Sequence, residues 1–201
     1  LGRTPLKEEP DWAVGLENQS LQQRAIEFLK ESCEKPTPQK VRKAVSMIEA
    51  NRSISSTLMR IRNAGAEAEY IATDVADAGS LGKVLKPLIK KWGPVTGIIH
   101  GAGVLADQWI ENKNLKEIHQ VFHTKVNGLN ALLEVADPAF LRHLLLFSSA
   151  AGFFGNAGQT DYAAANEILN QKAIEYQNNH PDCRVISFNW GPWEAGMVTE
   201  E

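Results

Sequence analysis

From residue 65 onward, short apolar runs alternate with longer segments of helical periodicity. The runs at 95–100, 144–147 and 184–190 are typical of strands buried on both faces, and 66–73 alternates as a further strand. The segments 80–92, about 115–136 and one that carries Tyr162 predict helices. This alternation indicates an α/β fold with right-handed crossovers and a parallel sheet.

The first 64 residues follow a different pattern. Residues 7–15 are acidic and interrupted by proline, which predicts a loop before a helix over about 20–33. Thr37 and Pro38 are a good N-cap and first position for a second helix, and a third helical piece over 53–64 ends at Gly65. Two or three helices here predict an inserted subdomain rather than one crossover.

Composition limits the classes of function. The 201 residues are 43% hydrophobic, enough for the core of one domain, and the net charge of -3 argues against a nucleic-acid partner. No apolar segment approaches the roughly 20 residues that cross a bilayer. Cys33 and Cys183 lack metal-ligand spacing and are most simply reduced thiols. We expect a soluble, cytoplasmic protein without a metal.

The stretch 147–166 concentrates the candidate chemistry. Ser148 and Ser149 close a buried strand at its carboxyl end, where open parallel sheets form their ligand crevices. A glycine-containing loop follows, and Asp161 is placed to cap the next helix. Tyr162 and Asn166 are four residues apart, so they face the same side of that helix. Either a strand-end serine or a first-turn tyrosine alone is usually structural, and only the combination predicts an active site.

Further motifs extend this pattern along the chain. They are Thr73-Asp-Val, Ile99-His-Gly-Ala-Gly-Val, Lys125-Val-Asn-Gly, Phe147-Ser-Ser, Gln159-Thr-Asp-Tyr-Ala-Ala-Ala-Asn and Asn189-Trp-Gly-Pro-Trp. In this order and spacing the chain resembles ketoreductase domains of polyketide and polyunsaturated fatty acid synthases, in the short-chain dehydrogenase/reductase superfamily. The resemblance runs from Gly65 to about Met197, and it implies a partial Rossmann-like, doubly wound parallel sheet.

One departure from the ordinary superfamily pattern supports this resemblance. The superfamily has a lysine four residues after the tyrosine, and Asn166 stands at that position. Synthase ketoreductases instead supply the lysine from the preceding helix, which Lys125 matches. Taken by itself, a lysine such as Lys125 would more often lie on a solvated helix face, and only the exchange at Asn166 favours a catalytic role.

The resemblance implies a reaction and four catalytic residues. Tyr162 would donate a proton to the ketone oxygen, and Ser149 would hold that oxygen beside it. Lys125 would favour the phenolate and hold the nicotinamide ribose, while Asn166 would complete the polar relay. The cofactor would supply the hydride.

NADPH is the cofactor that the resemblance implies. Arg3 resembles the arginine that pairs with the 2′-phosphate in this family. The other expected cofactor contacts, besides Lys125 and Tyr162, are Asp74, Val75, Gly101, Ala102, Gly103, Pro192 and Trp193. Alternatively, Gly101 and Gly103 serve only to let the chain turn tightly after the strand.

Two residues bear on the stereochemistry of the product. Leu105-Ala-Asp resembles the leucine-aspartate-aspartate motif of ketoreductases that give the D-configured alcohol, with Asp107 as the final aspartate and Ala106 in place of the middle one. Phe154 stands where the opposite class often has tryptophan. These residues favour the D-alcohol, although an exposed Asp107 without a substrate role is the alternative.

The resemblance also predicts the domain organisation. Residues 1–6 would end the second Rossmann strand, 7–64 would form a loop and helical insert, and 65–201 would be the catalytic part. We expect the family's glycine-rich first unit outside this sequence, which would then be an internal part of a multidomain synthase. Its partners would be an acyl carrier protein and other synthase domains. Alternatives are a catalytically silent structural module and a short-chain reductase of a free carbonyl metabolite.

Overall fold

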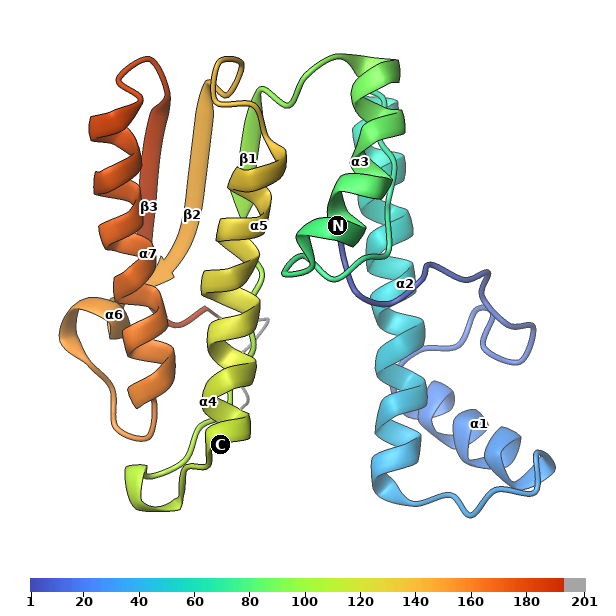
Figure 1. Cartoon of the computed structure of the whole chain (residues 1–201). Helices are drawn as coiled ribbons and strands as arrows, with labels where there is room; N and C mark the ends of the chain where they lie inside the picture. Colours follow the sequence, from blue (N-terminus) through green and yellow to red (C-terminus); the bar gives the residue numbers. More distant parts are fainter. Residues whose placement is uncertain (194–201) are drawn as a thin grey trace. The chain divides into compact units, whose positions relative to one another are not determined.

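The computed structural model describes residues 1–193, which form two compact units, Leu1–Ala72 and a second that begins at Thr73 (Figure 1). The second unit contains a parallel sheet of three strands in the order β1 (Gly97–His100), β2 (His143–Ser149) and β3 (Arg184–Trp190). All three strands lie where the apolar runs predict them, and β3 has the predicted bounds. The α/β class with a parallel sheet is confirmed.

One face of the sheet is packed against helices. Ile98, Leu144 and Val185 lie side by side in the register of the three strands. On this face Ile98 and Leu144 are buried in a core with Leu129 of α5 (Gly128–Val135) and Leu169 of α7 (Thr160–Asn179). The helices that follow β1 and β2 therefore anchor the strands whose carboxyl ends carry the candidate chemistry.

Aromatic side chains gather on β2 and β3. Phe147 of β2 pairs in register with Phe188, and the Phe188 and Trp190 rings stack with centroids 5.2 Å apart. The Trp193 ring meets Trp190 edge to face at 5.0 Å and lies 6.4 Å from Phe147. Phe147 alternates with the buried Leu146 and Ser148, so this cluster lies on the opposite face of the sheet.

Side chains cap most of the remaining helices of the second unit. They are α3 (Ala78–Trp92), capped by Asp77, the 3₁₀ turn η1 (Ile110–Asn112), α4 (Leu115–Phe122) and the short α6 (Ala150–Phe154). Asn114 and Glu117 form a capping box at the start of α4. The predicted helix over 115–136 is present, but a π-helical turn, η2 (His123–Asn127), separates α4 from α5.

The first unit contains two helices, α1 (Asn18–Glu31) and α2 (Pro38–Asn63). Thr37 caps α2 as predicted, by accepting a hydrogen bond from the Lys40 amide. The prediction of two separate helices after Pro38 is wrong, because α2 runs unbroken for 26 residues without an internal glycine or proline. Midway along it, Arg52 pairs with Glu9 and donates to the Leu16 carbonyl at 2.7 Å, which holds the acidic loop against the helix.

The predicted strand at 66–73 is reduced to one parallel bridge between Gly2 and Ala72. The Gly2 amide donates to the Ile71 carbonyl at 3.1 Å, and the Tyr70 hydroxyl donates to the Thr4 carbonyl at 2.7 Å. An alternating pattern forms a strand only where a neighbouring strand supplies hydrogen-bond partners, and here the first residues of the chain offer a single bridge.

Within residues 1–193 the structure contains no helix that is long and apolar enough to cross a membrane. The same residues contain no group of three or more His, Cys, Asp or Glu side chains placed to hold a metal ion.

Candidate active site

Two serines lie at the carboxyl end of β2, and their surroundings differ. Ser148 is buried, and its hydroxyl donates to the Asn166 carbonyl at 3.0 Å. Ser149 caps α6, since its Oγ accepts a hydrogen bond from the Ala151 amide at 3.2 Å. The Ser149 hydroxyl therefore keeps its own proton available for another acceptor.

Tyr162 and Asn166 lie one turn apart near the start of α7. Asn166 is fully buried, and its Nδ2 donates to the Tyr162 carbonyl at 2.8 Å. The Asn166 Oδ1 is buried and has no hydrogen-bond partner within the described residues. Because buried polar atoms are nearly always bonded, this oxygen is an acceptor available to a bound group or a water.

The predicted capping role of Asp161 is wrong. Helix α7 begins at Thr160, and the position before it is occupied by Gln159. The Asp161 carboxylate instead accepts hydrogen bonds from the Tyr162 amide at 2.9 Å and from the Lys113 Nζ at 2.7 Å. Asp161 therefore lies inside the first turn of α7, where its carboxylate binds a first-turn amide and a lysine that is distant in the sequence.

The glycine-containing loop predicted after Ser149 begins with a short helix, α6, and Gly152 in that helix brings it against α7. A Cβ atom at this position would lie 3.0 Å from both the Asn166 Cβ and the Glu167 backbone nitrogen. The two helices therefore approach as closely as they do only because residue 152 has no side chain.

We expect Gly152→Ala to lower the free energy of unfolding by about 1–3 kcal/mol through overpacking. Gly82→Ala is the matched control, because Gly82 is also helical and its added Cβ would lie 4.0 Å from the nearest atom, in Val135. The control should be neutral or more stable by about 0.5–1 kcal/mol. Urea unfolding of the two variants tests this, and equal stability would contradict the close packing at residue 152.

Lys125 is directed into the protein by the π-helical turn. Its side chain is 3% exposed, which excludes the alternative of a solvated helix face. Its Nζ donates to the Phe147 carbonyl at 3.0 Å and lies 5.3 Å from the centroid of the Tyr162 ring. The structure therefore brings the lysine of one helix to the tyrosine of another.

His100 supports this turn from β1. It is 2% exposed, and its Nε2 lies 2.8 Å from the Lys125 carbonyl oxygen. Gly128 leaves room for the imidazole, because a Cβ there would lie 3.2 Å from the His100 Cε1. Burial lowers the pKa of His100, so the ring is neutral at pH 7 and its Nε2–H donates to that carbonyl.

The charge state of Lys125 is sensitive to pH. Burial away from water disfavours the ammonium and lowers the pKa of Lys125 from 10.5 to about 8. The side chain is therefore still largely protonated at pH 7, but it loses its proton well below the pH at which an exposed lysine would. A buried ammonium facing a tyrosine ring is a site prepared for proton transfer.

The 101–113 loop, which follows β1, carries Asp107. The Asp107 carboxylate is exposed and accepts a hydrogen bond from the side-chain Nε2 of Gln159 at 2.8 Å. Phe154 projects from α6 with 82% of its surface exposed, and its ring meets Phe153 edge to face at 4.9 Å. Both residues flank the segment that leads into Tyr162, and their effect on stereochemistry stays a prediction.

The residues expected to contact a cofactor lie in several places. Asp74 accepts from the Ala76 amide at 3.0 Å, and Val75 packs over Gly128. The expected residues Gly101, Ala102 and Gly103 directly follow the carboxyl end of β1. Pro192 is exposed, and Trp193 is half exposed against the aromatic cluster. Arg3 is exposed in the first unit, next to the bridge at Gly2.

Within the second unit, Lys125 and the backbone at Gly101 fit a nicotinamide dinucleotide chemically. The Lys125 ammonium has three N–H donors and directs one of them to the Phe147 carbonyl, which leaves donors for ribose hydroxyls. At Gly101, the nearest atom to an added Cβ would be 3.9 Å away, in the ring of Phe147, so a flat group can approach the backbone there.

Sequence reasoning missed Lys113 and His100. Lys113 lies in a polar segment, Glu-Asn-Lys-Asn, whose composition is that of an ordinary surface loop. His100 belongs to a motif that is recognisable, but nothing local indicates that its partner is a backbone carbonyl 25 residues away. Both contacts depend on the tertiary fold.

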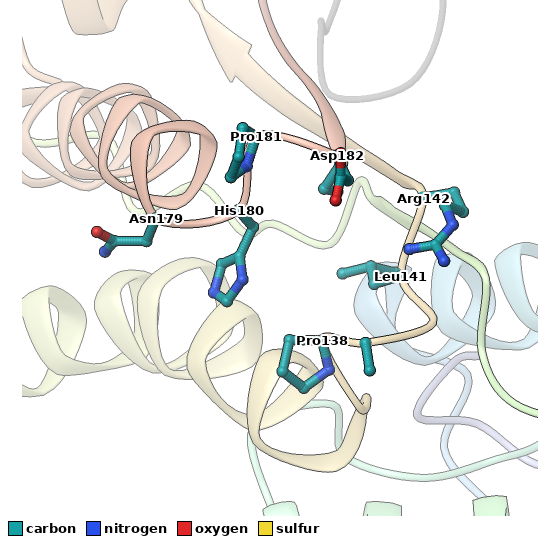
Figure 2. Close-up of a pocket in the computed structure, with 9 residues that line it drawn as sticks. Pro138, Leu141, Arg142, Asn179, His180, Pro181 and Asp182 are labelled. Carbon is teal, nitrogen blue, oxygen red and sulfur yellow. The ribbon is translucent and has the colours of Figure 1, made fainter.

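A pocket of about 310 Å³ lies at the opposite ends of the strands, beside the amino termini of β2 and β3 (Figure 2). Arg142, His180 and Asp182 are among the side chains around it. It contains none of the predicted site residues, so it is separate from the candidate active site.

Comparison with known sequences gives consistent matches. The KR domain family model matches residues 21–195. A polyunsaturated fatty acid synthase polypeptide of Thraustochytrium sp. is 39% identical over 209 residues, which cover 100% of this chain and 7% of that protein. The polyketide synthase PksN of Bacillus subtilis is 34% identical over 157 residues, which cover 75% of this chain and 3% of that protein.

Solved structures agree with the sequence matches. A ketoreductase from the first module of phoslactomycin biosynthesis in Streptomyces sp. HK803 aligns with a TM-score of 0.67 and 36% identity, over 73% of this chain and 33% of its own. An N-terminal ketoreductase from the macrolactin assembly line aligns with a TM-score of 0.65 and 31% identity, over 71% of this chain and 30% of its own. The chain thus spans about a third of these proteins and far less of the synthases.

Proposed function

This chain belongs to the KR domain family, which has the Rossmann-type fold of the short-chain dehydrogenases/reductases, and we propose that it reduces a β-ketoacyl thioester to the β-hydroxyacyl thioester. One observation carries this proposal: the buried Lys125 ammonium lies 5.3 Å from the ring centroid of Tyr162, at the carboxyl edge of a parallel sheet. Such an arrangement suits the transfer of a proton to an oxygen that gains negative charge.

Tyr162 is the proposed proton donor. A ketone oxygen becomes an alkoxide as hydride reaches the carbon, and a phenol at hydrogen-bond distance can supply its proton. The phenolate that remains is stabilised by the positive charge of Lys125, which the low-dielectric interior strengthens. The lysine therefore acts on the tyrosine through space, without itself taking part in the proton transfer.

Ser149 is the proposed donor to the ketone oxygen. Its Oγ accepts from the Ala151 amide, which fixes the oxygen and leaves the hydroxyl proton directed elsewhere. A fixed donor stabilises developing negative charge without reorganisation during the reaction. Asn166 is proposed to complete the relay through its unpaired, buried Oδ1.

NADPH is the proposed cofactor, and it would supply the hydride. Lys125 and Tyr162 would hold the nicotinamide ribose, Asp74 and Val75 would lie at the adenine, and Arg3 would pair with the 2′-phosphate. The backbone of residues 101–103 and the side chains of Pro192 and Trp193 would flank the ribose and nicotinamide.

The proposed product is the D-configured alcohol. This proposal rests on Asp107 in Leu105-Ala-Asp and on Phe154, where the opposite class often has tryptophan. The hydrogen bond between Gln159 and Asp107 supports it, because it gives the aspartate a fixed place beside the start of α7.

The proposed substrate is delivered by an acyl carrier protein within a multidomain synthase. The relatives that carry similar segments are named as synthases, and this chain corresponds to only 7% and 3% of two of them. The other domains of such a synthase are the proposed partners.

The proposal is tested by NADPH oxidation in the purified full-length protein, with a β-ketoacyl thioester of a simple thiol as substrate. We expect Ser149→Ala to lower kcat by about 10²–10³-fold, because it removes one donor to the developing oxyanion. Chromatography on a chiral phase identifies the alcohol.

Ser148→Ala is the matched control for Ser149→Ala. It removes the buried bond to the Asn166 carbonyl and should cost about 1 kcal/mol of stability with kcat nearly unchanged. Equal losses of kcat in the two variants would contradict the proposed role of Ser149. A full-length protein that binds NADPH but reduces no β-ketoacyl thioester would instead support a structural module.

A further inference from the structure

A buried ion pair joins the 101–113 loop to the start of α7. The Lys113 Nζ lies 2.7 Å from the Asp161 Oδ1, and the two side chains are 3% and 1% exposed. We propose that Lys113 and Asp161 are a positioning pair, which fixes the loop that carries Asp107 relative to the hydroxyl of Tyr162. This inference rests on the proposed function, because it assigns the pair a role in orienting the ketone.

The ion pair is bonded at both ends to the backbone of the segments that it joins. The Lys113 ammonium also donates to the Ala106 carbonyl at 2.7 Å, one residue before Asp107. The Asp161 Oδ1 also accepts from the amide of Tyr162 at 2.9 Å. A displacement of the loop is therefore transmitted through two side chains to the backbone of the proposed proton donor.

Two further contacts join the same segments. The Gln108 amide donates to the Gly158 carbonyl at 3.0 Å, and the Gln159 side chain donates to the Asp107 carboxylate at 2.8 Å. These contacts are nearer the surface than the ion pair. The loop and the start of α7 are thus held together from the exposed Asp107 to the buried Asp161.

The burial of two opposite charges argues for a geometric role. Taking an ammonium and a carboxylate out of water is costly, and well-packed apolar side chains of similar size often stabilise a fold as well or better. What an apolar pair cannot provide is direction, since hydrogen bonds fix the angle and distance between the segments and hydrophobic contact does not. The pair therefore suits a place where orientation matters more than stability.

The test uses the double variant Lys113→Met/Asp161→Asn in the full-length protein. Met retains much of the lysine's length, and Asn retains an acceptor for the Tyr162 amide, so no unpaired charge remains buried. We expect an unchanged melting temperature, a fall in kcat of at least about 10-fold, and a ratio of D- to L-alcohol that falls by a similar factor. Amide hydrogen exchange in the 101–113 loop should become faster by at least about 10-fold.

A second variant does not depend on the buried pair. Gln159→Glu places a second carboxylate against Asp107 at the surface, so the fold should tolerate it. We expect faster exchange in the loop and a lower D to L ratio. Arg24→Met/Glu31→Gln, which neutralises an exposed pair on α1, is the control and should change none of these measurements.

The outcomes separate this inference from the proposed function. If the unaltered protein reduces the thioester and the double variant keeps its kcat, alcohol ratio and loop exchange, the positioning role is overturned. If the unaltered protein reduces nothing, the proposed function fails, and hydrogen exchange alone decides whether the pair couples the loop to α7. If the double variant shows the changes in exchange, kcat and alcohol ratio but also has a clearly lower melting temperature, the pair is merely structural.

Discussion

Tyr162→Phe should lower kcat by about 10²–10⁴-fold and leave the stability of the protein within about 0.5 kcal/mol. The phenol supplies the proton in the proposed reaction, so its loss removes general acid catalysis. Among the described residues 1–193, the contacts of Tyr162 do not use its hydroxyl: its amide donates to Asp161, its carbonyl accepts from Asn166, and its ring faces Lys125. Phenylalanine preserves all three contacts.

Single-turnover kinetics with NADPH and a β-ketoacyl thioester, combined with urea unfolding, measure the two effects. The affinity of the variant for NADPH, followed by fluorescence, should fall by no more than about 10-fold, because one of the two proposed ribose contacts is lost while Lys125 remains in place. A variant that keeps more than about a tenth of the original kcat would exclude Tyr162 as the proton donor.

Lys125→Met should abolish most activity and at the same time stabilise the protein at pH 7. Burial lowers the pKa of Lys125 from 10.5 to about 8, so the folded state holds a charge that it disfavours. At about 1.4 kcal/mol for each pKa unit, this cost is on the order of 3 kcal/mol below pH 8. Methionine removes the cost but loses the bond to the Phe147 carbonyl, which leaves a gain of about 1–3 kcal/mol.

The lowered pKa of Lys125 also determines how the stability of the protein changes with pH. Between about pH 8 and 10.5 the unfolded chain binds a proton at Lys125 that the folded chain does not, so stability rises with pH across this window. The advantage of the methionine variant should therefore be greatest at pH 7 and nearly absent at pH 10.5. Urea unfolding at the two pH values measures this, and a variant less stable than the original at pH 7 would contradict the desolvation cost.

Catalytic activity should fall as the pH rises and Lys125 loses its charge, whereas stability should rise. The value of kcat/KM should fall as the pH rises through about 8, because the ammonium that stabilises the phenolate is lost. Lys125→Arg is the control, since a guanidinium stays protonated, and any residual activity should lose this inflection. An unchanged inflection in the arginine variant would assign the titration to another group.

The sequence predicted those parts of the fold that depend on local patterns. The strand Arg184–Trp190 has its predicted bounds, because an apolar run between polar turns leaves little choice. The start of α2 was predictable from Thr37 and Pro38, whose effects act within one turn. Its length was predicted wrongly, because the apolar periodicity is interrupted between residues 48 and 53, although no glycine or proline breaks the helix there.

The candidate site was predictable where a motif carries its own spacing. Tyr162 and Asn166 lie on one helix face because they are four residues apart. The burial of Lys125 needed a π-helical turn, which has no simple sequence pattern, and only the resemblance to synthase ketoreductases suggested it. The ion pair between Lys113 and Asp161 joins residues 48 positions apart and was invisible to any local pattern.

The π-helical turn determines which side of the helix Lys125 faces. Val121, Lys125 and Leu129 are spaced four residues apart and are all buried, although an ordinary α-helix would rotate such positions progressively away from one side. The wide turn absorbs that rotation, so the apolar anchors on both sides stay in place while a cation occupies the dry position between them. A π-helical turn holds one more residue than an α-helical turn, so the position of Lys125 depends on the number of residues in this helix as well as on their identity.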